Sequence, residues 1–361
     1  MNSFLWTGKS YFRAALLLGA LSWARTLSGQ DTGVQPNTGN TENDAVSDSA
    51  TIVSFNVPGA TETLPYGINT NGATAGSYYN SAGHYRGFVR NQAGAFVTFA
   101  VPKGLDTYPL SINDDGSVTG YYSGRDFPYP NRGFLRQSDG TIITFDVPDA
   151  TNTLPASLNA SGTITGFYSD SNNVYHGFLR TPGGDLTRFN APGAGSGSSQ
   201  GTVALSINAA GAVTGSYYDS TQNSHGFVRS PSGNLVIFDV AGCLDTSAAS
   251  INDAGTVTGI CAQGGTNYGY LRVAGVSTKY IVPGSTLGVQ PAAINEKGAV
   301  TGLYWGKSEV VHGYLRHSSG DIVSFDPAGS TWTQPTALNA AGVVTGYFID
   351  ATGYHGFLRK P

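Results

Sequence analysis

The chain has 361 residues, of which only 12% are charged, and its formal net charge is -4. Because no run of Lys or Arg occurs, it lacks the positive patch that nucleic acid or an anionic membrane surface requires. Its 50 glycines, 20 tyrosines and 17 phenylalanines, with one methionine, favour many short strands joined by tight turns over packed helices. We therefore expect an all-β protein that, in its mature form, partners neither nucleic acid nor a membrane.

Residues 1–29 have the order of a secretory signal peptide. Lys9 and Arg13 precede an apolar run at 15–21, and small residues follow it. The run is too short for a stable membrane-spanning helix, and a retained signal anchor is the alternative. The mature protein is expected to be secreted, periplasmic or attached to the cell surface.

Residues 30–50 contain almost no large apolar side chains, so they cannot bury a core and are expected to form a disordered linker. The folded part is expected to be a single domain over residues 51–361.

Within this domain one pattern recurs about every 45 residues. It consists of an Ile-Asn-x-x-Gly turn, a strand with Thr-Gly and aromatics, a Gly-Phe-Leu-Arg strand and a strand ending in Phe-Asp. The turn asparagines that mark the period are Asn69, Asn113, Asn159, Asn208, Asn252, Asn295 and Asn339. Four short strands, here called a to d, in this length are typical of one propeller blade. The sequence therefore predicts a seven-bladed β-propeller of four-stranded blades.

The two ends of the domain supply complementary parts of one blade. Residues 51–56 have the sequence of a strand d with no strands a to c before them, whereas the last repeat stops after its strand c. The N-terminal strand is therefore expected to complete the last blade and close the ring, which removes two unpaired edges. An open array with two polar caps is the alternative.

The segment His-Gly-Phe-Leu-Arg occurs at residues 176–180 and 355–359, together with the Ile-Asn-x-x-Gly turns and Phe-Asp-Val-Pro motifs. This combination resembles the bacterial extracellular repeat proteins named for a His-Ala-Phe motif, the HAF repeat family. The resemblance covers residues 51–361, with Gly where the family name has Ala. It implies export and a repeat-built β architecture, and it supplies no activity and no catalytic residues.

The recurrent Asn and the Arg that ends each strand c are interpreted as structural, since Asn caps its own turn and Arg packs its stem. Four histidines precede the Gly of strand c: His176, His225, His312 and His355. Equivalent positions on neighbouring blades lie on a circle and cannot share one metal. The Asp-containing turns near 170 and 219 lack the spacing of an EF-hand, although calcium binding there is an alternative. No metal and no cofactor are expected.

The two cysteines are expected to form a disulfide. Cys243 lies in the loop before a strand a, and Cys261 lies in the following strand b. These positions should lie at the same face of the ring within one blade's width, and an oxidising compartment favours the bond.

The loops d–a and b–c vary between repeats, whereas the turns a–b and c–d on the opposite face are short and alike. Binding residues usually lie on variable loops of a rigid scaffold, so a ligand site is expected on the variable face. Three aromatic residues lie one position past the usual aromatic of strand b, with amide and carboxylate groups nearby that suit sugar rings. The candidate ligand-binding residues are Tyr79, Asn80, Asp170, Tyr218, Asp219, Trp305 and Asp350. Packing of the aromatics against neighbouring loops is the alternative.

The leading interpretation is a monomeric, exported binding or scaffolding module for glycans or cell-surface proteins. The alternative is a secreted polysaccharide lyase or glycosidase on the same scaffold. A retaining glycosidase needs two carboxyls about 5 Å apart, and the acidic residues are scattered one per blade. We therefore assign no catalytic residues and disfavour an enzyme.

Overall fold

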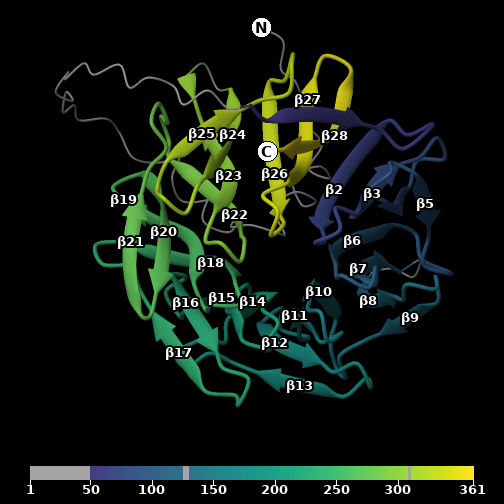
Figure 1. Cartoon of the computed structure of the whole chain (residues 1–361). Coiled ribbons are helices and arrows are strands. Elements are labelled where there is room, and N and C mark those ends of the chain that lie inside the picture. Colours follow the sequence, from purple (N-terminus) through teal and green to yellow (C-terminus); the bar gives the residue numbers. More distant parts are fainter. Residues whose placement is uncertain (1–48, 125–129, 308–309) are drawn as a thin grey trace, which may run out of the picture. The chain divides into compact units, whose positions relative to one another are not determined.

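The computed structural model describes residues 49–124, 130–307 and 310–361. The expected signal peptide and all but the last two residues of the expected linker lie outside these described residues. The described part contains 28 β-strands and no α-helix. Within it, no helix is long and apolar enough to cross a membrane. The prediction of an all-β architecture built from repeated four-stranded units is confirmed (Figure 1).

The strands pair antiparallel in groups of four, and each group follows one sequence repeat. The first three groups are β2 (Glu62–Ile68), β3 (Thr74–Tyr79), β4 (Tyr85–Arg90), β5 (Phe96–Phe99); β6 (Thr107–Ile112), β7 (Val118–Ser123), β8 (Asn131–Arg136), β9 (Ile142–Phe145); and β10 (Asn152–Leu158), β11 (Ile164–Ser169), β12 (Tyr175–Arg180), β13 (Leu186–Phe189). The next two are β14 (Gly201–Ile207), β15 (Val213–Tyr218), β16 (Ser224–Arg229), β17 (Leu235–Phe238); and β18 (Asp245–Ile251), β19 (Val257–Gln263), β20 (Thr266–Val273), β21 (Val276–Tyr280). The last two are β22 (Val289–Ile294), β23 (Val300–Trp305), β24 (Val311–Arg316), β25 (Ile322–Phe325); and β26 (Trp332–Leu338), β27 (Val344–Asp350), β28 (Gly353–Lys360), β1 (Thr51–Phe55).

Parallel bridges join some neighbouring groups, between β12 and β14, β24 and β26, and β28 and β2. The hydrogen-bonded sheets therefore contain 12, 8, 4 and 4 strands. The strand β1 pairs with β28 from Thr51↔Lys360 to Phe55↔Gly356, so the first and last strands of the domain belong to one group.

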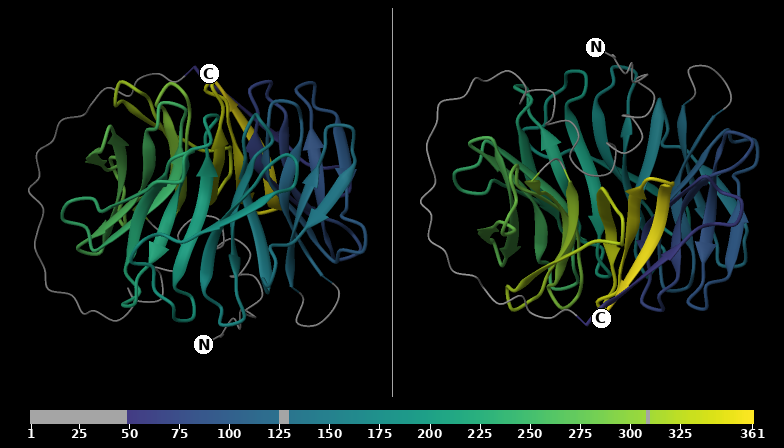
Figure 2. Two further views of the ribbon diagram at one scale, coloured as in Figure 1. Left: turned by 90° about the horizontal axis from the view of Figure 1, so that it is seen from below. Right: turned by 90° about the horizontal axis from the view of Figure 1, so that it is seen from above.

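The strands run between two faces (Figure 2). Because consecutive strands are antiparallel, the connections alternate between these faces. We call the face with the β2–β3 and β4–β5 turns, and their equivalents, the turn face. The opposite face, with the β3–β4 and β5–β6 connections and their equivalents, is the loop face.

The glycine that follows Thr in strand b, or Ala75 in the first repeat, is required by a bulge in the strand beside it. In the first repeat the register of β2 against β3 shifts between Pro65 and Gly67. A Cβ on Gly76, in the facing strand, would lie 2.2 Å from the backbone oxygen of Leu64. The bulge also accommodates Pro65, whose missing N–H would interrupt a regular ladder.

The glycine of each His-Gly-Phe segment is required by an aromatic ring on strand d. A Cβ on Gly177 would lie 2.5 Å from the Phe189 ring, and a Cβ on Gly226 would lie 2.5 Å from the Phe238 ring. Alanine at these positions would collide with the ring, which explains the glycine before the Phe of strand c.

The hydrophobic core lies between neighbouring repeats. One cluster, for example, joins Ala75 of β3 to Val118 of β7 and Phe134 of β8. The arginine ending each strand c places its guanidinium 4.4 to 5.2 Å from the centre of a strand-d ring of the preceding repeat. The pairs are Arg90–Phe55, Arg136–Phe99, Arg180–Phe145, Arg229–Phe189, Arg272–Phe238, Arg316–Tyr280 and Arg359–Phe325. The repeated arginine is thus a packing residue between repeats.

The turn asparagines are linked in a closed circle of hydrogen bonds. Each Nδ2 donates to the backbone oxygen of the asparagine in the next repeat, over 3.0 to 3.3 Å, and Asn339 donates to Asn69 at 3.1 Å. Each Oδ1 accepts the backbone N–H four residues on, which caps the turn. The turn cap was expected from the sequence, whereas the bond between repeats was not. We call this set the asparagine circle.

Candidate functional site

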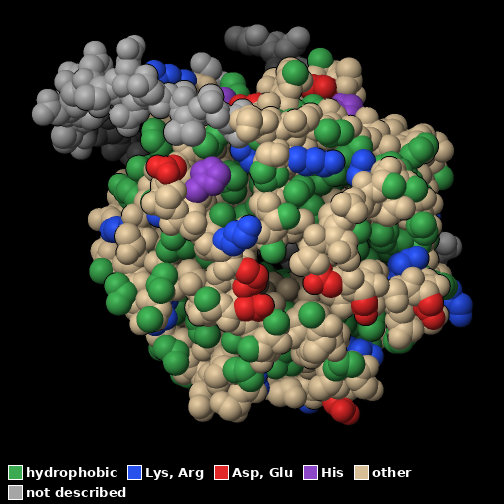
Figure 3. All heavy atoms as spheres, viewed as in Figure 1, with side chains coloured by type: hydrophobic (Ala, Val, Ile, Leu, Met, Phe, Trp, Pro, Cys, Tyr) green, Lys and Arg blue, Asp and Glu red, His purple; other side chains and the backbone are tan. Residues whose placement is uncertain are grey.

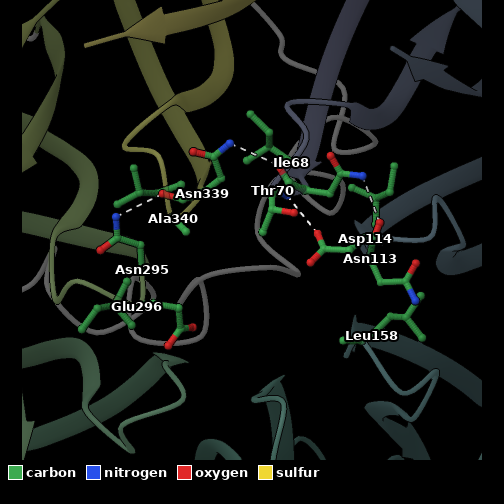
Figure 4. A pocket seen from close by; sticks show the side chains of 14 residues that line it. Ile68, Thr70, Asn113, Asp114, Leu158, Asn295, Glu296, Asn339 and Ala340 are labelled. Atoms are coloured by element: carbon green, nitrogen blue, oxygen red, sulfur yellow. Dashed lines mark hydrogen bonds between the residues drawn. The ribbon is translucent and has the colours of Figure 1, made fainter. Parts of the chain in front are cut away.

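A pocket of about 200 Å³ opens at the centre of the turn face, where the asparagine circle lies. Fourteen residues from five repeats line it (Figure 4). Seen over the whole face, Asp and Glu side chains gather around a central hollow (Figure 3). We call this cavity the axial pocket.

The lining comes from the same three consecutive positions in five repeats, except that Asn159 of the third repeat is not part of it. The last residue of strand a is apolar, as at Ile68, Ile112 and Ile294, and forms part of the wall. The asparagine follows and belongs to the asparagine circle. The next residue differs between repeats and also lines the pocket, as Thr70, Asp114, Ala160, Glu296 and Ala340.

The carboxylates at this variable position hold the backbone of the preceding repeat. Asp114 Oδ1 accepts the Thr70 N–H at 2.9 Å, and Glu296 Oε2 accepts the Asp253 N–H at 2.8 Å. Burial raises the pKa of Glu296, as does the charge of Asp253, whereas the hydrogen bond from the Asp253 backbone lowers it. Each carboxylate retains a second oxygen for a ligand.

Asp114 and Glu296 are the titratable side chains of the pocket lining, and Figure 4 shows them reaching from opposite sides. Among the described residues, no group of three or more His, Cys, Asp or Glu is arranged to hold a metal ion. The pocket lining provides carboxylate oxygens, asparagine amides and the Thr70 hydroxyl beside an apolar wall.

The axial pocket lies on the turn face, whereas the sequence placed a site on the loop face. None of the seven candidate ligand-binding residues lines this pocket. The repeated asparagine was the only feature of the sequence that pointed to these turns. Because it occurs in every repeat, it does not distinguish Asp114 or Glu296 from the equivalent residues.

The polar candidates on the loop face cap their own turns. Asn80 Oδ1 accepts the His84 N–H at 3.0 Å, and Asp170 Oδ1 accepts the Val174 N–H at 3.0 Å. Equivalent bonds run from Asn223 N–H to Asp219 and from Thr352 N–H to Asp350. The side chains of Asp170, Asp219 and Asp350 also face the strand-c histidines His176, His225 and His355 at 3.1 to 3.4 Å.

Two of the three aromatic candidates are buried. Tyr218 and Trp305 are each only 9% exposed. Trp305 belongs to a buried cluster with Leu303 and Val311, and burial raises the pKa of Tyr218 to about 12. Tyr79 is half-buried, with its ring centre 4.9 Å from that of Tyr85. Tyr218 and Trp305 therefore pack against neighbouring residues, which was the alternative interpretation of the sequence.

A disulfide joins Cys243 and Cys261, with 5.5 Å between their Cα atoms, as expected for this pair. It connects the loop after β17 to strand β19. Both cysteines also contact the hydrophobic cluster around Tyr270. The bond therefore holds this loop against the core of the fifth repeat.

The sequence matches no family model, and no curated protein matches it. Among solved structures, it is similar to puromycin hydrolase with a TM-score of 0.55 and 11% identity, over 84% of this chain and 54% of that one. A prolyl endopeptidase gives a TM-score of 0.50 and 10% identity, over 83% and 46%. The chain therefore spans about half the length of these two proteins. A lectin of Aleuria aurantia gives a TM-score of 0.43 and 11% identity, over 78% and 96%. The first two likenesses show a propeller-like fold, and they show the fold alone.

Proposed function

We propose that this protein is an exported, monomeric, seven-bladed β-propeller that binds a sugar group of a glycan in the axial pocket. The observation that carries the proposal is the pocket itself. Side chains from five repeats converge there, and the asparagine circle fixes the backbone that presents them. A rigid site of this kind loses little conformational freedom when a ligand binds.

Three contacts support closure of the seven repeats into a ring. Asn339 donates to the backbone oxygen of Asn69 at 3.1 Å, across the junction between the last and first repeats. Strand β1 pairs with β28. The Arg90 guanidinium lies 4.8 Å from the centre of the Phe55 ring. Closure in this way removes both unpaired sheet edges at the junction.

Export is supported by the signal-like segment at residues 1–29 and by the disulfide, because disulfides persist in oxidising compartments. The resemblance to the HAF repeat family points to the same location. We accordingly propose that the mature protein is secreted, periplasmic or on the cell surface, with a linker at 30–50 before the propeller.

A sugar fits the chemistry of the pocket. Its hydroxyls can donate to the second oxygens of Asp114 and Glu296 and exchange hydrogen bonds with Thr70. Its C–H groups can contact the apolar wall that includes Ile112 and Leu338. The volume of about 200 Å³ is below the range of pockets for drug-sized ligands, which suits one sugar ring or the end of a glycan.

Binding accounts for the geometry better than hydrolysis. A glycosidase places two carboxyl groups on either side of one bond, at most about 10 Å apart. In the axial pocket the carboxylates belong to the second and sixth repeats, and each accepts a backbone N–H of a neighbouring repeat. Because a backbone N–H already holds each carboxylate, the two suit fixed hydrogen-bond acceptors better than a general acid and a general base.

The test is a glycan-array screen of the purified domain, followed by titration of any sugar that binds to variants of the pocket. Asp114→Asn and Glu296→Gln preserve shape and remove charge, and each should weaken binding about tenfold, the effect of losing one charge-assisted hydrogen bond. The matched control is Asp139→Asn, since Asp139 is an exposed acid on a turn of the same face and does not line the pocket. This variant should bind normally.

Two outcomes would overturn the proposal: binding of no arrayed glycan, or binding that neither pocket variant affects. Hydrogen exchange identifies the face used. Protection of the turns after Asn69 and Asn113 would support the axial pocket. Protection confined to the β3–β4 turn beside Tyr79 would instead place the ligand on the loop face.

A further inference from the structure

His225, on β16, faces a carboxylate at each of its two ring nitrogens. Nδ1 lies 2.8 Å from Asp239 Oδ1, and Nε2 lies 3.3 Å from Asp219 Oδ2. The ring stacks on Tyr217 with 4.8 Å between centres. Asp219 begins the turn between β15 and β16, and Asp239 directly follows β17. The histidine therefore connects a loop-face turn to the end of the outer strand.

The turn that Asp219 begins also holds the long loop at residues 190–200, which precedes β14. Gln200 Nε2 donates to the Ser220 backbone oxygen at 3.1 Å, and the Gly195 N–H donates to the Tyr218 oxygen at 2.8 Å. Gln222 Nε2 donates to the Ser198 oxygen at 3.4 Å. A change in the hydrogen bonding of Asp219 would therefore alter the turn, and through these bonds the position of the loop at 190–200.

Only the imidazolium form of His225 can donate to both carboxylates. A neutral imidazole has one N–H and one lone pair, so a lone pair would face a negatively charged oxygen. Two other repeats supply a comparison. His176 faces Asn190 and His355 faces Asn56 at the position of Asp239, at 2.8 and 3.0 Å. An amide can either donate or accept, so a neutral histidine satisfies those clusters.

We propose that His225, Asp219 and Asp239 form a pH-sensitive latch, which in its protonated state ties the β15–β16 turn, and through it the loop at 190–200, to the end of β17. The titratable and charged groups facing His225 are Tyr217, Asp219 and Asp239. The loop at 190–200 packs against Tyr217 through Ala191 and Ala194 and carries no charged or titratable side chain.

The direction of the response follows from the charges. Burial lowers the pKa of His225, but the hydrogen bonds and charges of Asp239 and Asp219 outweigh it, so the pKa is raised. Burial raises the pKa of Asp219, and hydrogen bonds from the turn and from His225 bring it down to about 2. The stabilisation is therefore complete below the ordinary histidine pKa of about 6.5 and is lost as pH rises through the raised value.

The test combines NMR titration of the histidine rings with hydrogen exchange of the whole domain between pH 5.5 and 8.5, corrected for intrinsic exchange rates. In the wild-type protein His225 should titrate above about 6.5. Exchange of the backbone amides at 220–223 and 195–200 should rise at least about threefold over this range as the latch opens. In Asp239→Asn, which reproduces the cluster of His176, the His225 pKa should fall and the pH dependence should disappear.

A wild-type His225 that titrates at or below 6.5, or exchange with the same pH dependence in Asp239→Asn, would overturn the latch. The converse variant, Asn190→Asp, gives the third repeat the same two carboxylates and provides an independent readout if Asp239→Asn does not fold. It should make exchange of residues 171–174 pH-dependent. An unchanged profile there would likewise contradict the proposal.

Discussion

The turn face and the loop face are built from the same seven repeats but use them in opposite ways. On the turn face every repeat contributes the same Asn-x-x-Gly turn, and the asparagines bond from one repeat to the next. On the loop face each connection differs, and residues such as Asp170 and Asp350 cap turns of their own repeat. Where these equivalent turns converge, the variable residue directly after each asparagine lines a shared pocket. Variable loops that satisfy their own polar groups do not create a site by variation alone.

The largest effect is expected at the junction of the two chain ends. Deletion of residues 51–56 removes the partner of β28 and the Phe55 ring, which is 8% exposed and contacts Arg90 and Phe88. Loss of a buried Phe alone costs about 4 kcal/mol. We expect at least this loss in the free energy of unfolding, measured by denaturant titration. The exposed substitution Thr51→Ala is the control, and an unchanged melting temperature of a monomeric deletion variant would contradict ring closure.

A similar effect is expected at a buried aromatic of the loop face. Trp305→Ala should cost about 4 kcal/mol, because this side chain is 9% exposed and packs on Leu303 and Val311. Tyr79→Ala should cost about 1 kcal/mol, since Tyr79 is only half-buried. Thermal unfolding of both variants distinguishes a packing residue from a free contact. If both variants lost equally little stability, neither residue would have a packing role, and both would again be candidates for ligand contact.

The disulfide should contribute somewhat less. Replacing both Cys243 and Cys261 by Ala removes a crosslink between residues 18 apart, which is worth about 3 kcal/mol in the chain-entropy account. Denaturant unfolding with and without reductant measures this loss. Reductant should lower the stability of the wild-type protein and leave the double variant unchanged. Insensitivity of the wild-type protein to complete reduction would show that the core alone holds this loop.

The smallest effect compares a turn within the asparagine circle with one outside it. Asn339→Ala loses the buried bond to the Asn69 oxygen and the cap on the Val343 N–H, for about 2 kcal/mol. Asn91 caps the exposed β4–β5 turn through the Ala95 N–H, so Asn91→Ala should cost about 0.5 kcal/mol. Chemical denaturation of the two variants measures how much the hydrogen bond between repeats adds to the free energy of unfolding. Equal losses would mean that each asparagine acts only within its own turn.

Several features of the domain could be derived from the sequence alone because they repeat or are local. The spacing of the seven asparagines predicted the repeats, and the motifs and length of each repeat predicted four strands. The Asn-x-x-Gly turns, the pairing of residues 51–55 with β28 and the Cys243–Cys261 bond followed from equivalent positions in other repeats. The position of a residue within the repeat determines its strand and its turn. Both could therefore be predicted from this one sequence.

The site depended on the tertiary structure. Thr70, Asp114 and Glu296 lie in three different repeats, and only the convergence of their turns at one centre brings them around a single pocket. The burial of Tyr218 and Trp305 is set by the residues that neighbouring segments place over them. The two carboxylates at His225 come from the turn before β16 and from the end of β17, 6 and 14 residues away along the chain, and the pairing of the strands brings both to one ring. A repeat pattern states which residues are equivalent, but the contacts between repeats decide which of them meet, because those contacts depend on side chains some 44 residues apart.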